Sequence, residues 1–149
     1  MFSFHVVEAE VRDFMNKLLR EKVFDAFGVR GVFIVSFARF EIDGAIPEEA
    51  RENDGGYCAW AEMRPYVFHI IKGRRPKTLK IVLSLPKEQA QMLHNNMSAC
   101  FLNIMFDGTQ ILCTATASEK SFALDRVADE IWCEYITEFF KKNNIAVRL

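Results

Sequence analysis

The sequence lacks the patterns that identify most metal sites and nucleotide-hydrolysing enzymes. Its three histidines share no spacing with its four cysteines, and no C-x-x-C pair is present. The glycine pair at 55–56 is not followed by Lys-Ser or Lys-Thr, so a phosphate-cradling loop is absent. No apolar run approaches the roughly 20 residues that cross a bilayer. We therefore expect no metal site, no cofactor and no membrane association.

We also expect no secretory leader. The first residues, Met1 to Val6, contain no basic segment followed by an apolar stretch. The cysteines Cys58, Cys100, Cys113 and Cys133 are scattered along the chain, which is typical of reduced thiols that pack as small apolar residues. Together these features predict a cytoplasmic protein.

Catalytic constellations are equally absent. His5, His69 and His94 are far apart and form no pattern with Ser, Cys or Asp that would indicate a triad. Neighbouring acids such as Asp129 and Glu130 belong to a surface and are not held at a defined separation as acid and base. We expect no catalytic residues and no enzyme, and a small enzyme with an unrecognised site is the third of three hypotheses.

The chain does have the material for a large core. It contains 149 residues, of which 50% are hydrophobic and 14 are Phe, while its formal net charge is only -1. A chain of this length buries a core without disulfides or metals, and one domain is its common size. We predict a single domain over residues 1–149 with an aromatic-rich interior.

Local patterns predict strands and a helix in the first half. Residues 2–6 alternate as a strand, and apolar residues from Val11 to Leu19 recur at helical spacing. A long strand over 32–42 leads to Asp43-Gly44, which predicts a hairpin with a return strand near Ala45. Residues 47–56 are polar and mostly acidic, and predict an exposed loop. Strand character returns at 57–61 and at 66–71, and a turn at 72–76 predicts a second hairpin with the strand at 79–85.

The second half has clearer signals. Pro86 suits the first turn of a short helix over 87–95, and strands at 99–106 and 110–117 flank a turn at Asp107-Gly108. An apolar stripe from Leu124 to Phe140 predicts the final helix. Trp132 should dock this helix onto the sheet. These elements give an α+β fold, an antiparallel sheet of hairpins with helices packed on one side. The order strand, helix, strand, Asp-Gly, strand occurs twice, and the alternative is an internal duplication.

Several short segments resemble an uncharacterised bacterial family of unknown function. The resemblance covers most of the chain and is carried by residues 14–19, Ile42-Asp43-Gly44, Trp60 with Arg64-Pro65, Ile71-Lys72-Gly73, residues 79–82 and Trp132. It implies a small single-domain cytoplasmic protein and transfers no catalytic residue.

A second resemblance is architectural. Paired strand-helix-strand-strand units resemble the domains of DNA sliding clamps, whose helices line a basic channel. The first helix carries Arg12, Lys17, Arg20 and Lys22, in keeping with that plan, but no clamp motif is present and 149 residues amount to about one clamp domain.

The most informative segment is basic. No carboxylate occurs between Met63 and Lys87, whereas five cations surround the turn of the predicted second hairpin: Lys72, Arg74, Arg75, Lys77 and Lys80. In a chain with almost no net charge, such local segregation is needed to attract anions. Lys and Arg bind nucleic-acid phosphates, and Tyr66 and Phe68 would stack on bases if they point outward.

Arg64 is a further candidate for anion binding, with Trp60 as its neighbour in a partner-binding site. The alternative is that Trp60 packs in the core and that Arg64 pairs with an acid.

Three interpretations of the basic segment remain open. Our leading hypothesis is a non-catalytic cytoplasmic binding or assembly module that contacts an anionic partner, such as nucleic acid, together with the basic first helix. The alternative is a self-associating structural or regulatory protein whose basic hairpin meets an acidic surface, the 48–54 loop or the final helix, in a second copy. A hairpin that merely keeps the protein soluble is the simplest interpretation.

Overall fold

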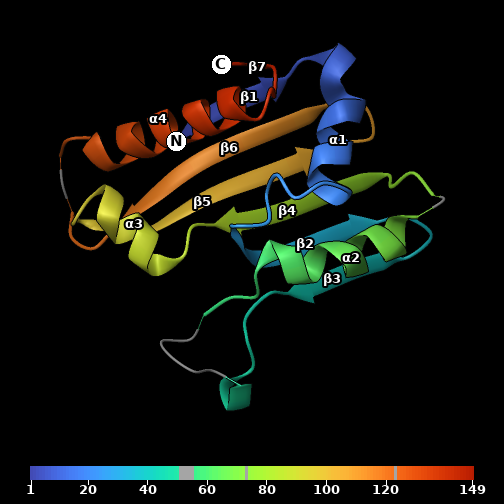
Figure 1. The fold of residues 1–149 in the computed structure, drawn as a ribbon, viewed down its shortest axis with the longest axis horizontal. Coiled ribbons are helices and arrows are strands. Elements are labelled where there is room, and N and C mark those ends of the chain that lie inside the picture. The colour runs from blue at the N-terminus through green and yellow to red at the C-terminus, as the bar shows by residue number, and fades with distance from the viewer. Residues whose placement is uncertain (51–55, 73, 123) are drawn as a thin grey trace.

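Seven strands form one antiparallel sheet in the order β3-β2-β4-β5-β6-β1-β7 (Figure 1). The computed structural model describes residues 1–50, 56–72, 74–122 and 124–149. The strands are β1 (Phe2–Val6), β2 (Gly28–Val35), β3 (Arg39–Asp43), β4 (Thr78–Ser84), β5 (Met97–Phe106), β6 (Ile111–Glu119) and β7 (Val147–Arg148). The α-helices are α1 (Val11–Leu19), α2 (Trp60–Ile71), α3 (Lys87–Leu93) and α4 (Val127–Lys142), with short 3-10 turns at Glu8–Glu10 and Glu48–Ala50. The predicted α+β class is confirmed.

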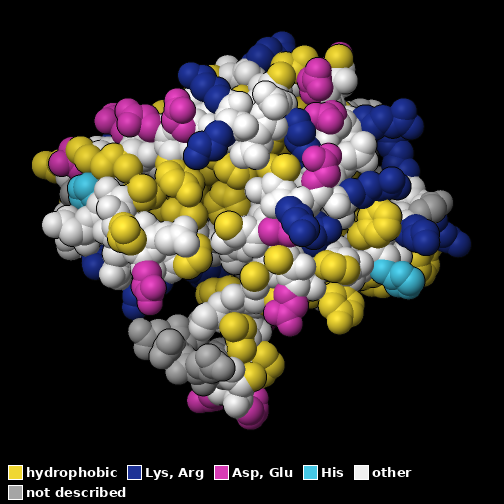
Figure 2. Space-filling model, viewed as in Figure 1, with side chains coloured by type: hydrophobic (Ala, Val, Ile, Leu, Met, Phe, Trp, Pro, Cys, Tyr) yellow, Lys and Arg dark blue, Asp and Glu magenta, His cyan; other side chains and the backbone are white. Residues whose placement is uncertain are grey.

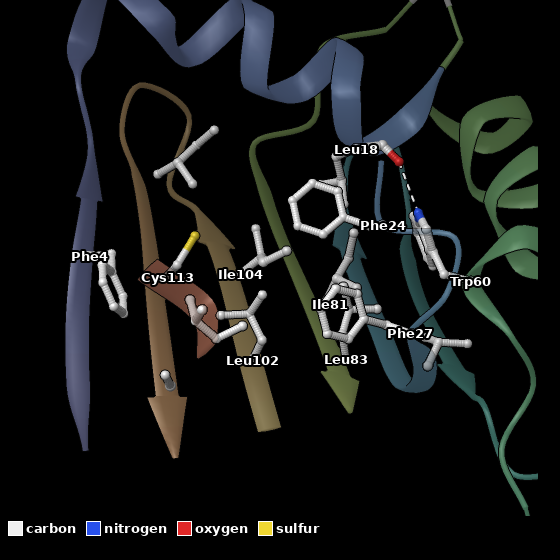
Figure 3. Packing of buried hydrophobic residues seen from close by; sticks show 14 of the residues in the cluster. Phe4, Leu18, Phe24, Phe27, Trp60, Ile81, Leu83, Leu102, Ile104 and Cys113 are labelled. Carbon is white, nitrogen blue, oxygen red and sulfur yellow. Dashed lines mark hydrogen bonds between the residues drawn. The ribbon is translucent and has the colours of Figure 1, made fainter. Parts of the chain in front are cut away.

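The core lies between the helices and one face of the sheet. A row of paired residues crosses four strands, and every member is buried: Phe4, Cys113, Ile104 and Ile81. Figure 3 shows these side chains on the same side of the sheet as Phe24 and Phe27, which precede β2. Strand side chains alternate between the two faces, and on the opposite face the paired residues Phe33, Lys80 and Met105 are exposed, so no helix of the described residues covers them. Helices on one side were predicted, and the structure confirms them.

Two tryptophans fasten helices to this core. Trp132 of α4 is fully buried and donates from Nε1 to the carbonyl of Phe101 in β5 over 2.9 Å. Trp60 of α2 is also fully buried and donates to the carbonyl of Leu18 at the end of α1, again over 2.9 Å (Figure 3). A buried indole needs such an acceptor, and each bond therefore fixes both the depth and the rotation of its helix. The predicted docking of the final helix by Trp132 is confirmed.

The predicted long strand over 32–42 is wrong, because the chain turns back at residues 36–38 and β2 pairs with β3. The N–H of Ser36 donates to the carbonyl of Ala38 across that turn. Asp43-Gly44 therefore forms no hairpin turn. Gly44 is buried, and a Cβ atom there would overlap the carbonyl group of Val29, so glycine serves close packing at this position. The predicted return strand is reduced to an isolated bridge between Ala45 and Tyr57.

The predicted strands at 57–61 and 66–71 are also wrong, and with them the second hairpin, since residues 60–71 form α2. Trp60, Val67 and Ile71 are buried, and their spacing of seven and four residues places them on one face of a helix. His69, which a strand would put on the same face as Val67 and Ile71, is exposed. Pro65 is tolerated inside α2 although it cannot donate to the carbonyl four positions earlier, because that residue is exposed to water.

The second half of the chain follows the predictions closely. The short helix, the two long strands and the turn between them are all present, and Gly108 has a φ of 106° that favours glycine. The carboxylate of Asp107 accepts hydrogen bonds from the backbone N–H groups of Thr109 and Gln110 across that turn. The final helix begins at Val127, and Leu124 is 92% exposed before it.

The structure tests the predicted acidic loop, the basic segment and the internal duplication only in part. Residues 48–50 of the predicted acidic loop are exposed, and residues 51–55 lie outside the described residues, as does Gly73 in the basic segment. The order strand, helix, strand, strand does occur twice, as β1-α1-β2-β3 and β4-α3-β5-β6, but the partners differ: β1 pairs with β6 and β7, whereas β4 pairs with β2 and β5. A clamp-like arrangement therefore stays a prediction. None of the helices in the described ranges has both the length and the apolar character to span a bilayer.

Candidate functional site

The basic segment forms the connection between α2 and β4 and lies against α1. Pro76 is buried there, and the N–H of Lys77 donates to the carbonyl of Val35 at the end of β2 over 2.8 Å. These contacts hold the connection at the end of the sheet beside the β5-β6 turn. Figure 2 shows Lys and Arg side chains gathered at this end of the molecule, beside α1 and the end of α2.

Two arginines of the connection are held by aromatic rings. The guanidinium of Arg74 lies 4.7 Å from the ring centroid of Phe37, which is 65% exposed in the β2-β3 turn. Arg75 donates from Nη2 to the carbonyl of Gly108 over 2.7 Å, and its guanidinium lies 5.7 Å from the ring centroid of Phe106. A stacked guanidinium keeps its N–H edge available for an anion while its position is fixed.

Helix α1 and the residue that follows it add two arginines, which complete this surface. Arg20 lies with its guanidinium 5.2 Å from the ring centroid of Phe68 in α2, and it lines a hollow of about 200 Å³ together with Lys72 and Arg74. Arg12 lines a neighbouring hollow of about 550 Å³ together with Arg75 and the acidic Glu8. The two hollows share a wall, to which Met15 and Pro76 contribute.

We call this region the basic surface, and define it by six residues from α1 and the α2-β4 connection: Arg12, Arg20, Lys72, Arg74, Arg75 and Lys77. Only the last four were singled out as candidate site residues from the sequence. The eight-residue separation of Arg12 and Arg20, which places both near one side of a helix, is the signal that points to the other two. Lys17 does not belong to the surface, because its Nζ pairs with Asp13 at 2.8 Å and also donates to the carbonyl of Asn144.

Two of the candidate residues lie away from this surface. Lys80 belongs to the helix-free face of β4, since its neighbours Leu79 and Ile81 are buried on the other face, and its Nζ lies 5.8 Å from the ring centroid of Phe33. Arg64 makes two hydrogen bonds to the carboxylate of Asp25, of 2.9 and 3.0 Å, and each side chain is only 16% exposed. The structure therefore gives Arg64 the structural role that the sequence left as an alternative.

Aromatic side chains lie on α2 and beside the basic surface. Tyr66 in α2 is 69% exposed and points outward as base stacking requires, whereas Phe68 is half-buried beneath Arg20. Phe37 is exposed beside Arg74. The surface thus combines cations with the exposed ring of Phe37, a combination typical of proteins that bind single-stranded nucleic acid.

In the ranges that the structure describes, no three His, Cys, Asp or Glu side chains are placed to hold a metal ion. Burial raises the pKa of all four cysteine thiols above its ordinary value, to about 12 for Cys100. Each thiol is therefore protonated at neutral pH and is a poor nucleophile.

The comparisons with known proteins agree with the resemblance stated from the sequence. No curated protein and no solved structure matches this chain. Residues 17–148, which include all of the α2-β4 connection and most of the sheet, match a family described as a family of unknown function, DUF5721. The chain belongs to the family DUF5721.

Proposed function

We propose that this protein is a non-catalytic binding module that contacts single-stranded nucleic acid through the basic surface. The observation that carries the proposal is the convergence of five cations around two adjoining hollows, with the exposed ring of Phe37 beside Arg74: Arg12, Arg20, Lys72, Arg74 and Arg75. The four free cysteines suit a reducing compartment, and we place the module in the cytoplasm.

The physical argument begins with phosphate binding. A cation that neutralises a phosphate releases a condensed counterion, so affinity depends on the number of such contacts and falls with salt. The stacked positions of Arg20 and Arg74 lower the entropy cost of ordering them on a partner. An Arg edge grips a phosphate with two hydrogen bonds, which a flexible Lys does not.

The exposed rings favour a single strand over a duplex. Phe37 is 65% exposed beside Arg74 and Tyr66 is 69% exposed on α2, so splayed bases have access to both rings. Base stacking on such rings contributes about 1–3 kcal/mol per base and is tolerant of sequence. We therefore expect weak sequence preference and a higher affinity for single strands.

Fluorescence anisotropy with a labelled oligonucleotide of about 16 nucleotides tests the proposal. With about six phosphate contacts, the affinity for the single strand should fall roughly 100- to 1000-fold between about 50 and 200 mM salt. The variant Arg74→Glu/Arg75→Glu should lose this salt-sensitive binding. The matched control is Lys141→Glu/Lys142→Glu at the end of α4, which changes the net charge equally but leaves the basic surface intact.

Equal affinities of the two double variants, both folded, would contradict the proposal, as would the absence of binding at low salt. Self-association is the second candidate, because Glu130, Glu134 and Glu138 of α4 are exposed at four-residue spacing and offer an acidic stripe to the basic surface of another copy. Self-association predicts a molecular mass that rises with protein concentration in sedimentation experiments without nucleic acid. It also predicts that the variant Arg74→Glu/Arg75→Glu stays monomeric.

A further inference from the structure

A β-bulge in β2 places an arginine at the opposite end of the sheet from the basic surface. The pairing of β2 with β4 shifts between Val29 and Gly31, so that Arg30 is an extra residue in the ladder. Bulges re-aim a side chain and occur often next to binding sites. Arg30 lies near the start of β2, whereas the basic connection bonds to Val35 at the end of β2. The two regions are therefore separate.

Two aromatic rings clamp the guanidinium of Arg30. Its Cζ lies 3.8 Å from the ring centroid of Tyr57 and 4.9 Å from that of Phe101. Its Nε donates to Oγ of Ser84 over 3.1 Å. Because the two rings and Ser84 hold the guanidinium and Nε is already used, the edge with the terminal nitrogens is left to meet a ligand.

This clamped cation has no carboxylate partner. Among the residues that the structure describes, no Asp or Glu lies within 4.0 Å of the Arg30 guanidinium, in contrast to the bidentate pair of Arg64 with Asp25. The terminal nitrogens of Arg30 make no hydrogen bond within the described residues, and no fully buried side-chain nitrogen there lacks a partner. The unbonded edge of Arg30 is therefore open to solvent, which a small anion can replace.

A pocket of about 250 Å³ surrounds this edge. Its polar wall contains Arg30, Ser84, Ser98 and Lys87, and Tyr57 and Pro86 contribute apolar surface. Since Oγ of Ser84 accepts from Arg30, its own hydrogen is available to a ligand. The volume corresponds to about eight water molecules, which suits a small molecule and not a polymer.

We propose that this pocket binds a small molecule through an oxyanion, a phosphate or a carboxylate group, gripped by the two terminal nitrogens of Arg30. Both groups present two oxygens at the separation that the guanidinium fork matches. The aromatic clamp fixes that fork before the ligand arrives, and the hydroxyl of Ser84 supplies a further donor. The site is independent of the nucleic-acid proposal, because it shares no residue with the basic surface.

Isothermal titration calorimetry with inorganic phosphate, acetate and chloride tests this site in the whole protein. Saturable binding of phosphate or acetate, with none of chloride, is the expected result; phosphate alone would indicate a phosphorylated ligand, and acetate alone a carboxylic acid. Arg30→Gln and Arg30→Lys should each weaken binding at least about tenfold, because neither presents the planar fork. The matched control Arg39→Gln, on the exposed strand β3, should bind as the unaltered protein does.

A second measurement uses the unaltered protein, so it tests the site even if the Arg30 variants do not fold. In a proton-nitrogen NMR spectrum of the unaltered protein, the Arg30 Nε–H resonance should shift with the bound anion and follow the calorimetric saturation. No binding of either oxyanion, or a shift confined to other arginines, would overturn the site. A folded Arg30→Gln with undiminished affinity would overturn it as well, whatever the outcome of the Arg74→Glu/Arg75→Glu experiment.

Discussion

The arginines of this protein differ in what their guanidinium groups contact. Arg64 donates hydrogen bonds inside the fold, to the carboxylate of Asp25 and the carbonyl of Arg20. Hydrogen bonding to Asp25 raises the pKa of Arg64, which outweighs the opposite effect of burial. Arg74 instead stacks on Phe37 and offers its N–H edge to water. A sequence shows the charge of each residue but not these partners, so Arg64 and Arg74 are equivalent candidates until the fold is known.

Removal of Arg64 should therefore destabilise the fold without a change in nucleic-acid affinity. Arg64→Ala leaves the half-buried carboxylate of Asp25 without its partner, and we expect a loss of about 1–3 kcal/mol in the free energy of unfolding. Urea denaturation measures it, and a double-mutant cycle with Asp25→Ala should give a coupling of about 1 kcal/mol or more. Additive effects of the two substitutions would contradict the structural role of Arg64. A nucleic-acid affinity reduced as much as in Arg74→Glu/Arg75→Glu would show instead that Arg64 contributes to binding.

The Asp107 turn gives a prediction for pH. Hydrogen bonds from the N–H groups of Gln110 and Thr109 and from the Thr109 hydroxyl lower the pKa of Asp107 below its ordinary value of 3.8. A carboxyl group with a lower pKa in the folded than in the unfolded chain stabilises the fold above its ordinary pKa, and that contribution is lost as the pH falls through the folded-state pKa. Asp107→Asn keeps the acceptor oxygen but not the charge.

The substitution should therefore destabilise the protein near neutral pH, and the difference should disappear in acid, below the folded-state pKa of Asp107. Denaturant midpoints of both proteins over a pH series give this difference directly. A difference that persists unchanged below the folded-state pKa of Asp107 would mean that the amide fails to replace the turn geometry and that charge is not the cause.

At the scale of elements, the sequence predicts best where one signal is decisive. The Asp107-Gly108 turn, the strands beside it and the stripe of α4 have strong local patterns, and all are present. In contrast, residues 57–71 are rich in aromatic and β-branched residues, which favour strands, although Trp60, Val67 and Ile71 have helical spacing. In this segment the strand propensity of the residues conflicts with the helical spacing of those that are buried. The helix forms because it buries Trp60 against α1.

Substitutions on α2 distinguish a helix from a strand in solution. Val67 is fully buried, so Val67→Ala should cost about 2 kcal/mol of unfolding free energy. His69 is exposed, and His69→Ala should stay within about 0.5 kcal/mol of the unaltered protein. In a strand both side chains would lie on one face and both substitutions would be costly. Chemical denaturation of the two variants measures the contrast, and similar losses for both would exclude α2 as described.

At the scale of the whole molecule, the candidate site exists because of the order of the strands. The connection after α2 reaches α1, some 55 residues earlier in the chain, because β4 inserts beside β2 in the sheet. Arg30 likewise meets Phe101 only because β5 follows β4. Local patterns carry no information on which strands become neighbours, so the sequence could identify the basic segment and the basic first helix but neither their contact nor the clamp around Arg30.

The single sheet also bears on the prediction of one domain over residues 1–149. Trp60 lies at the α1-α2 side of the core, and Trp132 lies where α4 meets β5. Their surroundings belong to one continuous cluster of buried residues. If this cluster unfolds as a unit, every part of it should lose its structure at the same denaturant concentration.

Each tryptophan can report on its own side of the molecule. In Trp60→Phe only Trp132 fluoresces, and in Trp132→Phe only Trp60 does. Because each indole loses a buried hydrogen bond, both variants should be less stable than the unaltered protein by about 1–3 kcal/mol. Within each variant, the fluorescence midpoint in urea should coincide with the midpoint from far-ultraviolet circular dichroism, and the denaturant dependence should match in the two variants. A separate transition for either tryptophan would show that α1 with α2, or α4 with β5, unfolds independently, and the chain would then consist of two cooperative units.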